Sequence, residues 1–351
     1  MTRRTTTLLA GTVVAVILLA LLFGLSDVAE LTRRAHEIHW GFVVAATILS
    51  LFSYASIGLC QHALLAALGR RLPAELVVRV SLVGSVVSRS LRSGGASGLA
   101  FNTWFFGRLG VSAQLVASMV LGQLLLTNAV FAALAVVGFA CLVGAPLFGG
   151  PSPQQGLVIG NAIVAGVLGV GFLAAWVTLG SPRLRAPWAR RVERIVEALG
   201  RRFKRPGAGA KARELFDEAA TAVAGLVAGS SASWAAWGWA TARVAASLVA
   251  FWFCAIAADV HVSAAGIVLA YVLGKMAGTL SLVPAGIGLI EGSLAGTLHA
   301  VGAPLEAAVL AALLNRVAYH VVPLVLALAV FGPLARQAAR QAENSGALTP
   351  E

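Results

Sequence analysis

The sequence VPAGIGLIE at positions 283–291 interrupts an apolar segment that extends from residue 264 to residue 301. The first half of the chain has a similar break, SGGASG at positions 93–98, within an apolar segment over residues 74–109. Glycine and proline end helices and allow sharp turns. The apolar pieces beside the first break have about 15 residues, fewer than the roughly 20 that cross a bilayer as a helix. The apolar stretch that begins at residue 264 is long enough for a full crossing. Even so, each break predicts a hairpin of two short helices that enters and leaves the membrane on one side.

The composition indicates an integral membrane protein. Of the 351 residues, 59% are hydrophobic and 11% are charged, and the mean hydropathy is +0.87. A soluble domain has about 25% charged residues, so a soluble enzyme with a large core is excluded. No polar stretch is long enough to form a separate catalytic domain. Cys60, Cys141 and Cys254 lie in apolar segments without the spacing of a metal site, so we expect no metal and no disulfide.

Six other apolar segments are long enough to cross a membrane. They lie at residues 8–25, 41–68, 113–143, 156–179, 233–257 and 305–330. The first of them follows Arg3 and Arg4 and is longer than the apolar core of a signal peptide, so we expect an uncleaved helix. The sequence thus predicts an all-α polytopic membrane protein with about six full spans and two re-entrant hairpins. If the hairpins cross fully, the number rises to eight or so helices.

Basic residues indicate the orientation in the membrane. Eleven of the 26 lysines and arginines lie between Arg183 and Arg213, and the positive-inside rule places such a loop in the cytoplasm. Within residues 181–218, apolar side chains recur at helical spacing among these arginines, as in an amphipathic helix on a membrane surface. The net charge of +12 therefore reflects topology and attraction to anionic headgroups, and we expect no nucleic acid partner.

We expect a single membrane domain over residues 1–351 that is built from two related halves. The parts are a first half at 1–180 with hairpin 74–109, the basic loop 181–218, a second half at 219–335 with hairpin 264–301, and a polar tail at 336–351. The two glycine-rich breaks correspond to each other, and so do GVS at 110–112 and GAP at 302–304. If both termini and the basic loop are cytoplasmic, the hairpins enter from opposite sides of the inner (plasma) membrane. That arrangement is an inverted repeat, which places substrate sites near the midplane.

These motifs resemble the flippase-like family, also called the lysylphosphatidylglycerol synthase transmembrane region. Its second-half pattern Pro-Gly-Gly-x-Gly-x-x-Glu is similar to residues 284–291, its Gly-Val-Pro is similar to 302–304, and its helix arginine falls on Arg316. In the first half, Gly-Gly-x-x-Gly-Glu-x-x-Arg fits at its glycines but has Leu99 and Asn102 in place of the charged residues. The resemblance also covers Gly94, Gly95, Gly98, Trp104, Arg108, Gly110 and Ser112.

The resemblance implies a protein that moves or handles a lipid in a bacterial inner membrane. No stretch resembles the aminoacyltransferase domain of the multiple peptide resistance factors, so the family reading implies that this chain does not synthesise the lipid. The expected partner is a phosphate-bearing lipid, a class that includes aminoacylated and polyprenyl-linked forms. A homo-oligomer and a separate lipid-modifying enzyme stay open as protein partners.

Glu291, Arg316 and Lys275 are ionisable residues within predicted membrane segments. Such a residue costs about 2.5–3.5 kcal/mol on insertion scales, so it predicts a functional role. An arginine could hold a lipid phosphate, and Glu291 could meet a cationic headgroup or couple to protons. The alternative is a buried Glu291–Arg316 ion pair that fixes the register of two helices. The candidate lipid-binding residues are Glu291, Arg316, Gly286, Gly288, Pro284, Lys275, His320, Tyr319, Gly94, Gly95, Gly98, Arg92 and Arg108.

Two other classes of function stay open. The first is a membrane-embedded enzyme acting on lipid-linked substrates, which would use the acidic residues between Asp27 and His39. Arginines alternate with these acids, which favours a solvated interfacial helix, and no nucleophile, cofactor motif or nucleotide-binding P-loop is present in the sequence. We therefore expect no enzyme activity and no cofactor. The second is an accessory scaffold, which gains little from charges inside the membrane.

Overall fold

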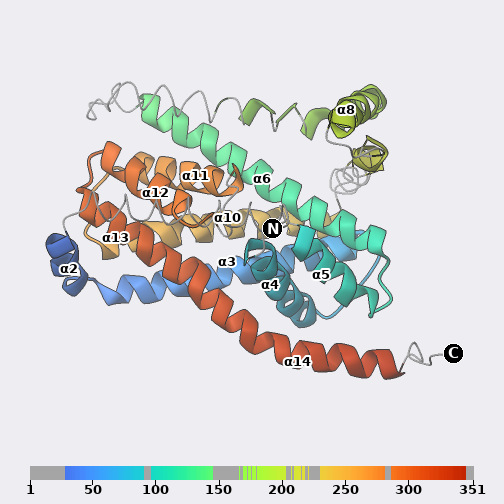
Figure 1. Ribbon diagram of the computed structural model, residues 1–351, viewed down its shortest axis with the longest axis horizontal. Helices are drawn as coiled ribbons and strands as arrows, with labels where there is room; N and C mark the ends of the chain where they lie inside the picture. Colours follow the sequence, from blue (N-terminus) through green and yellow to red (C-terminus); the bar gives the residue numbers. More distant parts are fainter. Residues whose placement is uncertain are drawn as a thin grey trace.

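The computed structural model describes residues 28–90, 96–144, 230–280 and 286–344. Between 166 and 220 it describes every residue except 167, 168, 172, 175, 179, 203–206, 208, 215, 218 and 219. The principal elements are α2 (Val28–His36), α3 (Trp40–Ala67), α4 (Ala74–Ser90), α5 (Ala96–Gly107), α6 (Ala113–Gly144), α8 (Pro182–Arg202), α10 (Ser231–Ala257), α11 (Ala264–Leu280), α12 (Leu289–Ala300), α13 (Leu305–Arg316), η3 (Val317–Val321) and α14 (Val322–Asn344). Across these described ranges the secondary structure is helical and contains no strand (Figure 1).

Four helices are long and apolar enough to cross a membrane. They are Trp40–Ala67, Ala113–Gly138, Ser231–Ala257 and Leu305–Gln337, the last of which continues through α13, η3 and α14. These helices confirm four of the six predicted spans. The predicted span at 8–25 lies outside the described residues, and much of 156–179 does too. The chain is thus an all-helical protein with the long apolar helices of a membrane protein, and the full number of spans stays a prediction.

Two helical hairpins stand where the glycine-rich breaks predict them. In the first, α4 has 17 residues and α5 has 12, and in the second α11 has 17 and α12 has 12. At 1.5 Å per residue these helices are about 26 Å and 18 Å long, shorter than the roughly 30 Å of a bilayer core. In each hairpin the two helices pack against each other. No single limb is therefore long enough to cross a bilayer upright.

The long helices α3 and α10 pack side by side and run in opposite directions (Figure 1). At one end, the N–H of His39 donates to the carbonyl of Ala257 at 3.2 Å. At the middle, the Ser53 hydroxyl donates to the carbonyl of Arg243 at 3.1 Å. Because α3 leads into the first hairpin and α10 into the second, the two hairpins enter the bundle from opposite ends.

The two halves match in the order and termination of their elements. Two residues past the last residue of α3 and of α10, the backbone has positive φ, at Gly69 (82°) and Asp259 (59°). Helices α5 and α12 are both followed by a glycine with positive φ, Gly110 (71°) and Gly302 (108°). The halves also cross over, because α6 packs on α11 and α14 packs on α4. Each hairpin thus packs against the long helical segment that follows the other hairpin in the sequence. Whether this match is an inverted repeat across a membrane stays a prediction.

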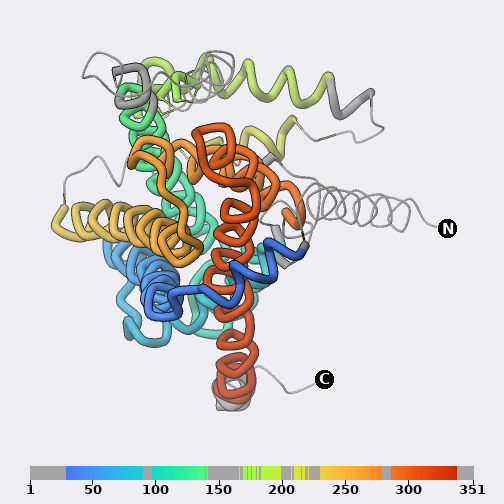
Figure 2. Tube along the Cα trace, turned by 90° about the vertical axis from the view of Figure 1, so that its left-hand side faces the viewer, coloured from blue at the N-terminus to red at the C-terminus, as the bar shows by residue number. Residues whose placement is uncertain are grey.

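Within the basic loop 181–218, residues Pro182–Arg202 form the predicted amphipathic helix α8. It appears end-on in Figure 1 and lengthwise in Figure 2, so it runs across the direction of the long helices. Leu184, Trp188 and Ile195 are exposed on it. The segment after α8 reaches the bundle at Ala220, which is buried in a small cluster that also contains Phe216 and Leu125 of α6. This geometry is the one expected of a surface helix.

The close packing of the first hairpin depends on Gly98. A Cβ at this position would lie 2.6 Å from Ser88 Cβ and 2.7 Å from the backbone oxygen of Gly84, whereas a Cβ at Gly107, on the same helix, would meet nothing within 4 Å. We expect Gly98→Ala to lower the free energy of unfolding by about 1–3 kcal/mol through overpacking. Gly107→Ala is the matched control and should be neutral or slightly stabilising. Equal melting temperatures of the two variants in detergent would contradict this packing.

Candidate functional site

One side chain, Tyr319 of η3, is contacted by a cation from each hairpin. Arg89, in the last turn of α4, lies with its guanidinium carbon 4.9 Å from the Tyr319 ring centroid, and its Nη2 donates to the Tyr319 hydroxyl at 3.3 Å. The Lys275 ammonium of α11 lies 3.7 Å from the same centroid. Arg89 is one residue from the end of α4, and Lys275 is about a turn and a half from the end of α11. The tips of both hairpins therefore converge on Tyr319.

All three tyrosines of the chain belong to this site. The guanidinium carbon of Arg89 lies 4.9 Å from the ring centroid of Tyr54 on α3. The Tyr54 hydroxyl donates to the Tyr319 carbonyl at 3.1 Å. Tyr271 of α11 lies 5.4 Å from the Lys275 ammonium. A cation over an aromatic face gains about 0.5–2 kcal/mol. We call Arg89, Lys275, Tyr54, Tyr271 and Tyr319 the central cation–aromatic cluster.

A π-helical turn presents Tyr319 to both cations. Across η3, the N–H of Val322 donates to the carbonyl of Val317, five residues earlier. Such turns inside α-helices are frequent at functional sites. His320 follows Tyr319, with the two ring centroids 5.3 Å apart. Its Nδ1 is buried and makes no hydrogen bond to the part of the chain that the structure describes. The turn thus brings a buried aromatic ring and a polar imidazole to the hairpin tips.

Glu291 and Arg316 form a buried ion pair beside this cluster. Arg316 Nη1 lies 2.9 Å from Glu291 Oε1, and the two side chains are 17% and 3% exposed. The other carboxylate oxygen, Oε2, accepts the N–H of Gly288 at 2.7 Å. Gly288 has a φ of 82° and Gly286 one of 62°, a conformation that suits glycine. The ion pair that the sequence predicts as one alternative is confirmed, and it ties the second hairpin tip to α13.

Positive charge exceeds negative charge inside the helices. Glu291 is the sole acidic side chain that is buried among the described residues. Against it stand the half-buried cations Arg89, Arg243, Lys275 and Arg316. Arg243 donates from Nη1 to the Thr127 hydroxyl at 2.7 Å. A cation inside a membrane is costly, and here tyrosine rings lie beside Arg89 and Lys275, and Glu291 pairs with Arg316.

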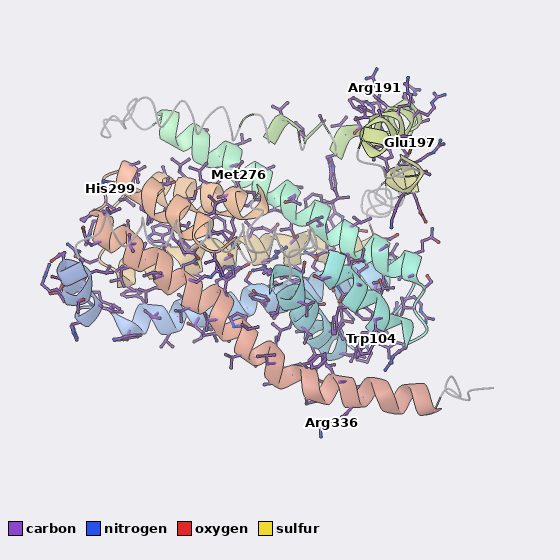
Figure 3. The ribbon with its side chains drawn as sticks, in the orientation of Figure 1. Trp104, Arg191, Glu197, Met276, His299 and Arg336 are labelled. Atoms are coloured by element: carbon purple, nitrogen blue, oxygen red, sulfur yellow. The ribbon has the colours of Figure 1, made fainter. Side chains whose placement is uncertain are left out.

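The remaining predicted site residues lie in three places: near the first hairpin tip, past the far end of α5, and outside the described residues. Gly98 lies buried at the first turn of α5, near the first hairpin tip. Arg108 lies past the other end of α5, exposed and 4.5 Å above the Trp104 ring, and Figure 3 shows Trp104 far from Met276, the neighbour of Lys275. Pro284, Gly94, Gly95 and Arg92 lie outside the described residues. The structure therefore does not bring Arg108 to the cluster, and its role in binding stays a prediction.

Sequence reasoning missed the tyrosines at positions 54 and 271 and the depth of Arg89. In the sequence, Arg89 lies near the end of an apolar segment. An arginine in that position usually extends its side chain to the membrane interface. The chain has three tyrosines, and in membrane proteins tyrosine is enriched at the two membrane interfaces. Tyr54, Tyr271 and Tyr319 instead lie inside apolar helical segments. This unusual placement was the signal that could have indicated a site.

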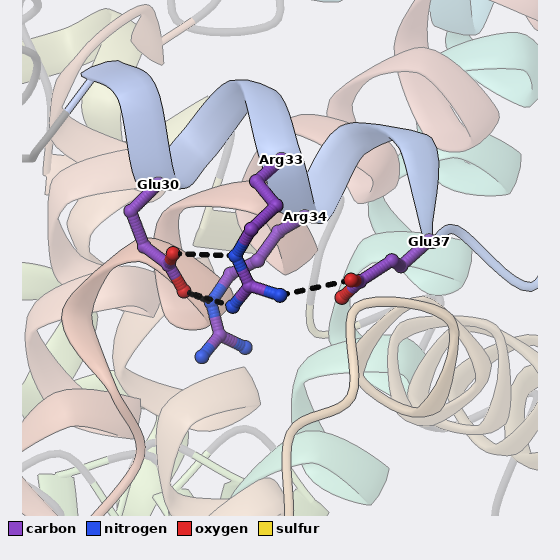
Figure 4. Close-up of polar contacts among 4 residues, drawn as sticks. All are labelled: Glu30, Arg33, Arg34 and Glu37. Atoms are coloured by element: carbon purple, nitrogen blue, oxygen red, sulfur yellow. Dashed lines mark hydrogen bonds and ion pairs between the residues drawn. The ribbon is translucent and has the colours of Figure 1, made fainter.

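The acidic residues near the N-terminal end of α3 are paired with arginines (Figure 4). On α2, Arg33 donates to both oxygens of Glu30 at 2.8 and 2.7 Å, and Arg34 adds a third contact at 2.8 Å. Arg33 also reaches Glu37 at 2.8 Å. This network fits the prediction of a solvated interfacial helix. In the described residues, no three His, Cys, Asp or Glu side chains lie together in a way that could hold a metal ion.

The α2 network makes a pH prediction. The hydrogen bond from Arg33, aided by Arg34, lowers the pKa of Glu30 to about 2. A lowered pKa means that the stabilisation is present above the ordinary value of 4.5 and is lost as the pH falls toward 2. We expect the carboxyl carbon of Glu30 to report an ionised group at pH 4 in a nuclear magnetic resonance titration. In Arg33→Gln/Arg34→Gln its midpoint should rise toward 4.5. An unchanged midpoint in that variant would contradict the assignment.

Four long apolar helices, two opposed hairpins and a cluster of cations and tyrosines at the hairpin tips define a polytopic helical membrane protein. The chain belongs to the family described as the lysylphosphatidylglycerol synthase TM region, whose model matches residues 8–327. The match covers most of the chain and confirms the resemblance seen in the motifs.

Comparison with curated proteins finds shorter similarities. The phosphatidylglycerol lysyltransferase of Staphylococcus aureus strain MRSA252 is 32% identical over 83 residues, which are 24% of this chain and 10% of that protein. The enzyme of the same name from strain COL is 31% identical over 83 residues, with the same shares of both chains. The matched stretch thus spans about a tenth of the length of these relatives. Together with the family, these relatives associate the chain with proteins that handle membrane lipids.

Proposed function

We propose that this protein binds a phosphate-bearing lipid at the central cation–aromatic cluster and moves it between the leaflets of the inner membrane, without synthesising it. The observation that carries the proposal is the meeting of Arg89 and Lys275, one from each hairpin, on Tyr319. Guanidinium and ammonium groups are the usual protein ligands of phosphate. The relatives act, by their name, on phosphatidylglycerol, a phosphate-bearing lipid. Aminoacylated and polyprenyl-linked forms belong to the same proposed class.

An inverted repeat supports a translocation role. Ser53 and Arg243 lie 190 residues apart, the same separation as Gly69 and Asp259 at the equivalent ends of α3 and α10. Equivalent positions of two antiparallel helices therefore touch each other, as expected where a two-fold axis passes between related halves. An inverted repeat with discontinuous helices places its substrate site at the repeat interface, near the midplane. In the proposed repeat the central cluster would take that position, because Arg89 comes from one hairpin and Lys275 from the other.

The distribution of charge supports the expected orientation. The turns that flank the first hairpin carry Arg70, Arg71 and Arg108, and Arg70 donates to the carbonyl of Gly110 at 3.0 Å. The turn before the second hairpin carries Asp259, and Glu306 follows that hairpin. By the positive-inside rule, the first end is cytoplasmic. The first hairpin then opens toward the cytoplasm and the second toward the opposite side, so that each gives access to the cluster from one side.

Headgroup translocation in proteoliposomes tests this function. The purified chain would be reconstituted with fluorescent phosphatidylglycerol, lysyl-phosphatidylglycerol or phosphatidylcholine, and a membrane-impermeant quencher would report which leaflet holds the label. We expect the anionic and aminoacylated lipids to equilibrate between leaflets faster than in empty vesicles, with their masses unchanged. No acceleration with any lipid, from folded protein, would overturn the proposal. A changed lipid mass would favour the enzyme alternative.

A further inference from the structure

The segment after α8 folds back on α8 and is held there by two glutamates. Glu193 accepts from Arg213 at 2.9 Å. One turn further, Glu197 accepts the backbone N–H of Gly209 at 2.9 Å. Figure 3 shows Glu197 and Arg191 near each other, far from Met276 of α11. The α8 region is therefore a built structure, separate from the central cluster.

A basic hollow of about 590 Å³ lies in this region. This volume is within the range of pockets that hold small ligands, roughly 300–1,000 Å³. Four arginines line it together with a tryptophan and a glutamate: Arg190, Arg191, Arg194, Arg213, Trp188 and Glu193. Since Glu193 is engaged by Arg213, the charge of the hollow is dominated by the other three guanidiniums. Such a lining suits a phosphate group, which arginine binds in a bidentate manner.

The position of the hollow on α8 indicates where the ligand comes from. Arg190 and Arg194 are four residues apart and form one strip along the helix, and Arg191 lies between that strip and the apolar one. Leu184, Trp188 and Ile195 form the adjacent strip and are 40%, 41% and 54% exposed. The Arg191 guanidinium stacks over Trp188 at 5.4 Å and so joins the two strips. An exposed apolar strip beside a basic one matches a helix lying in a membrane interface.

We propose that this hollow binds the phosphate headgroup of an anionic phospholipid in the leaflet against which α8 lies. The acyl chains of that lipid lie along the strip of Leu184, Trp188 and Ile195, and the headgroup phosphate lies among Arg190, Arg191 and Arg194. A soluble phosphate compound would use the arginines but would leave the apolar strip uncovered. This site is distinct from the proposed translocation site, and it anchors the cytoplasmic end of the bundle to anionic lipid.

Quenching of Trp188 fluorescence tests the site in the full chain. The protein would be placed in phosphatidylcholine nanodiscs containing a rising fraction of phosphatidylglycerol with brominated acyl chains, and Trp188→Phe would identify the signal of this residue. We expect saturable quenching of wild type. A hydrogen bond from an arginine to a phosphate contributes roughly tenfold or more in affinity, so Arg190→Gln/Arg194→Gln should raise the half-saturating fraction by at least about tenfold.

The matched control removes the same charge from the same helix outside the hollow. Arg183→Gln/Arg185→Gln should shift half-saturation about threefold or less, because neither residue lines the hollow. An equal shift in both double variants, or equal quenching by brominated phosphatidylcholine, would overturn the proposal. Displacement by millimolar glycerol phosphate would assign the site to a soluble ligand and would also overturn it. Lys275→Gln should leave this quenching unchanged, so failure here is distinguishable from failure of lipid translocation.

Discussion

Lys275→Gln should slow the translocation of phosphate-bearing lipid by about 10–150-fold, and Arg89→Gln should do the same. A hydrogen bond to a charged group contributes about 1.5–3 kcal/mol, and each of these side chains contributes one of the two cations at Tyr319. Because both act on one ligand beside one ring, the double variant should lose less than the product of the single effects. The measurement is the initial rate of headgroup movement in proteoliposomes, corrected for the amount of folded protein.

Arg79→Gln is the matched control for these variants. Arg79 lies on the same helix as Arg89, but it is half exposed and pairs with Glu75. An exposed pair contributes little, about 0–1 kcal/mol, so this variant should translocate within about twofold of wild type. If Arg79→Gln and Arg89→Gln slow translocation equally, the loss reflects charge on the hairpin as a whole and contradicts a specific role for the central cluster.

Glu291→Gln should lower the free energy of unfolding by about 3–5 kcal/mol, the usual cost of removing one partner of a buried ion pair. Glu291 is 3% exposed, pairs with Arg316 and accepts the N–H of Gly288, so the variant weakens both the pair and the helix cap. Glu291→Gln/Arg316→Gln should recover part of the loss, because it removes the arginine charge as well. The measurement is thermal unfolding in detergent, followed by intrinsic fluorescence.

Glu37→Gln is the corresponding surface control. Glu37 also pairs with an arginine, but its side chain is 61% exposed. Its loss should therefore change the free energy of unfolding by less than about 1 kcal/mol. Two results would show that the Glu291–Arg316 pair does not fix the second hairpin tip. One is a Glu291→Gln/Arg316→Gln protein that is less stable than Glu291→Gln, and the other is a Glu291→Gln protein that is as stable as wild type.

The elements of the fold could be predicted because their signals are local. Apolar length indicates the long helices at 40–67, 113–138, 231–257 and 305–337, and glycine with proline marks the hairpin tips. The first hairpin was expected at 74–109 and spans Ala74 to Gly107. The crossing of α6 onto α11 and of α14 onto α4 could not be predicted, since no local pattern states which half a helix packs against.

The candidate site could be predicted only in its second half. Glu291, Arg316, Lys275 and Tyr319 stand out because polar residues are rare within apolar segments. Tyr54 does not, because its role depends on a contact with Tyr319 across 265 residues of sequence. Asn102 stands where the family pattern has a charged residue, but Asn102 does not supply the cation of the first hairpin at the cluster. Asn102 is buried against Gly84, between the two helices of the first hairpin, while the cation of that hairpin at the cluster is Arg89.

Photo-crosslinking from the hairpin tips tests the central claim most directly. A photoreactive phenylalanine analogue at His320, which adjoins Tyr319 and whose Nδ1 is buried without a hydrogen bond in the described chain, would be activated in vesicles containing radiolabelled phosphatidylglycerol. The same analogue at Phe105, a fully buried core residue, is the control. We predict lipid attached at position 320, reduced by excess unlabelled phosphatidylglycerol and by Lys275→Gln, and none at position 105. Equal labelling at both positions, or none at 320 in protein that is folded, would contradict the claim that the lipid phosphate passes between the hairpin tips.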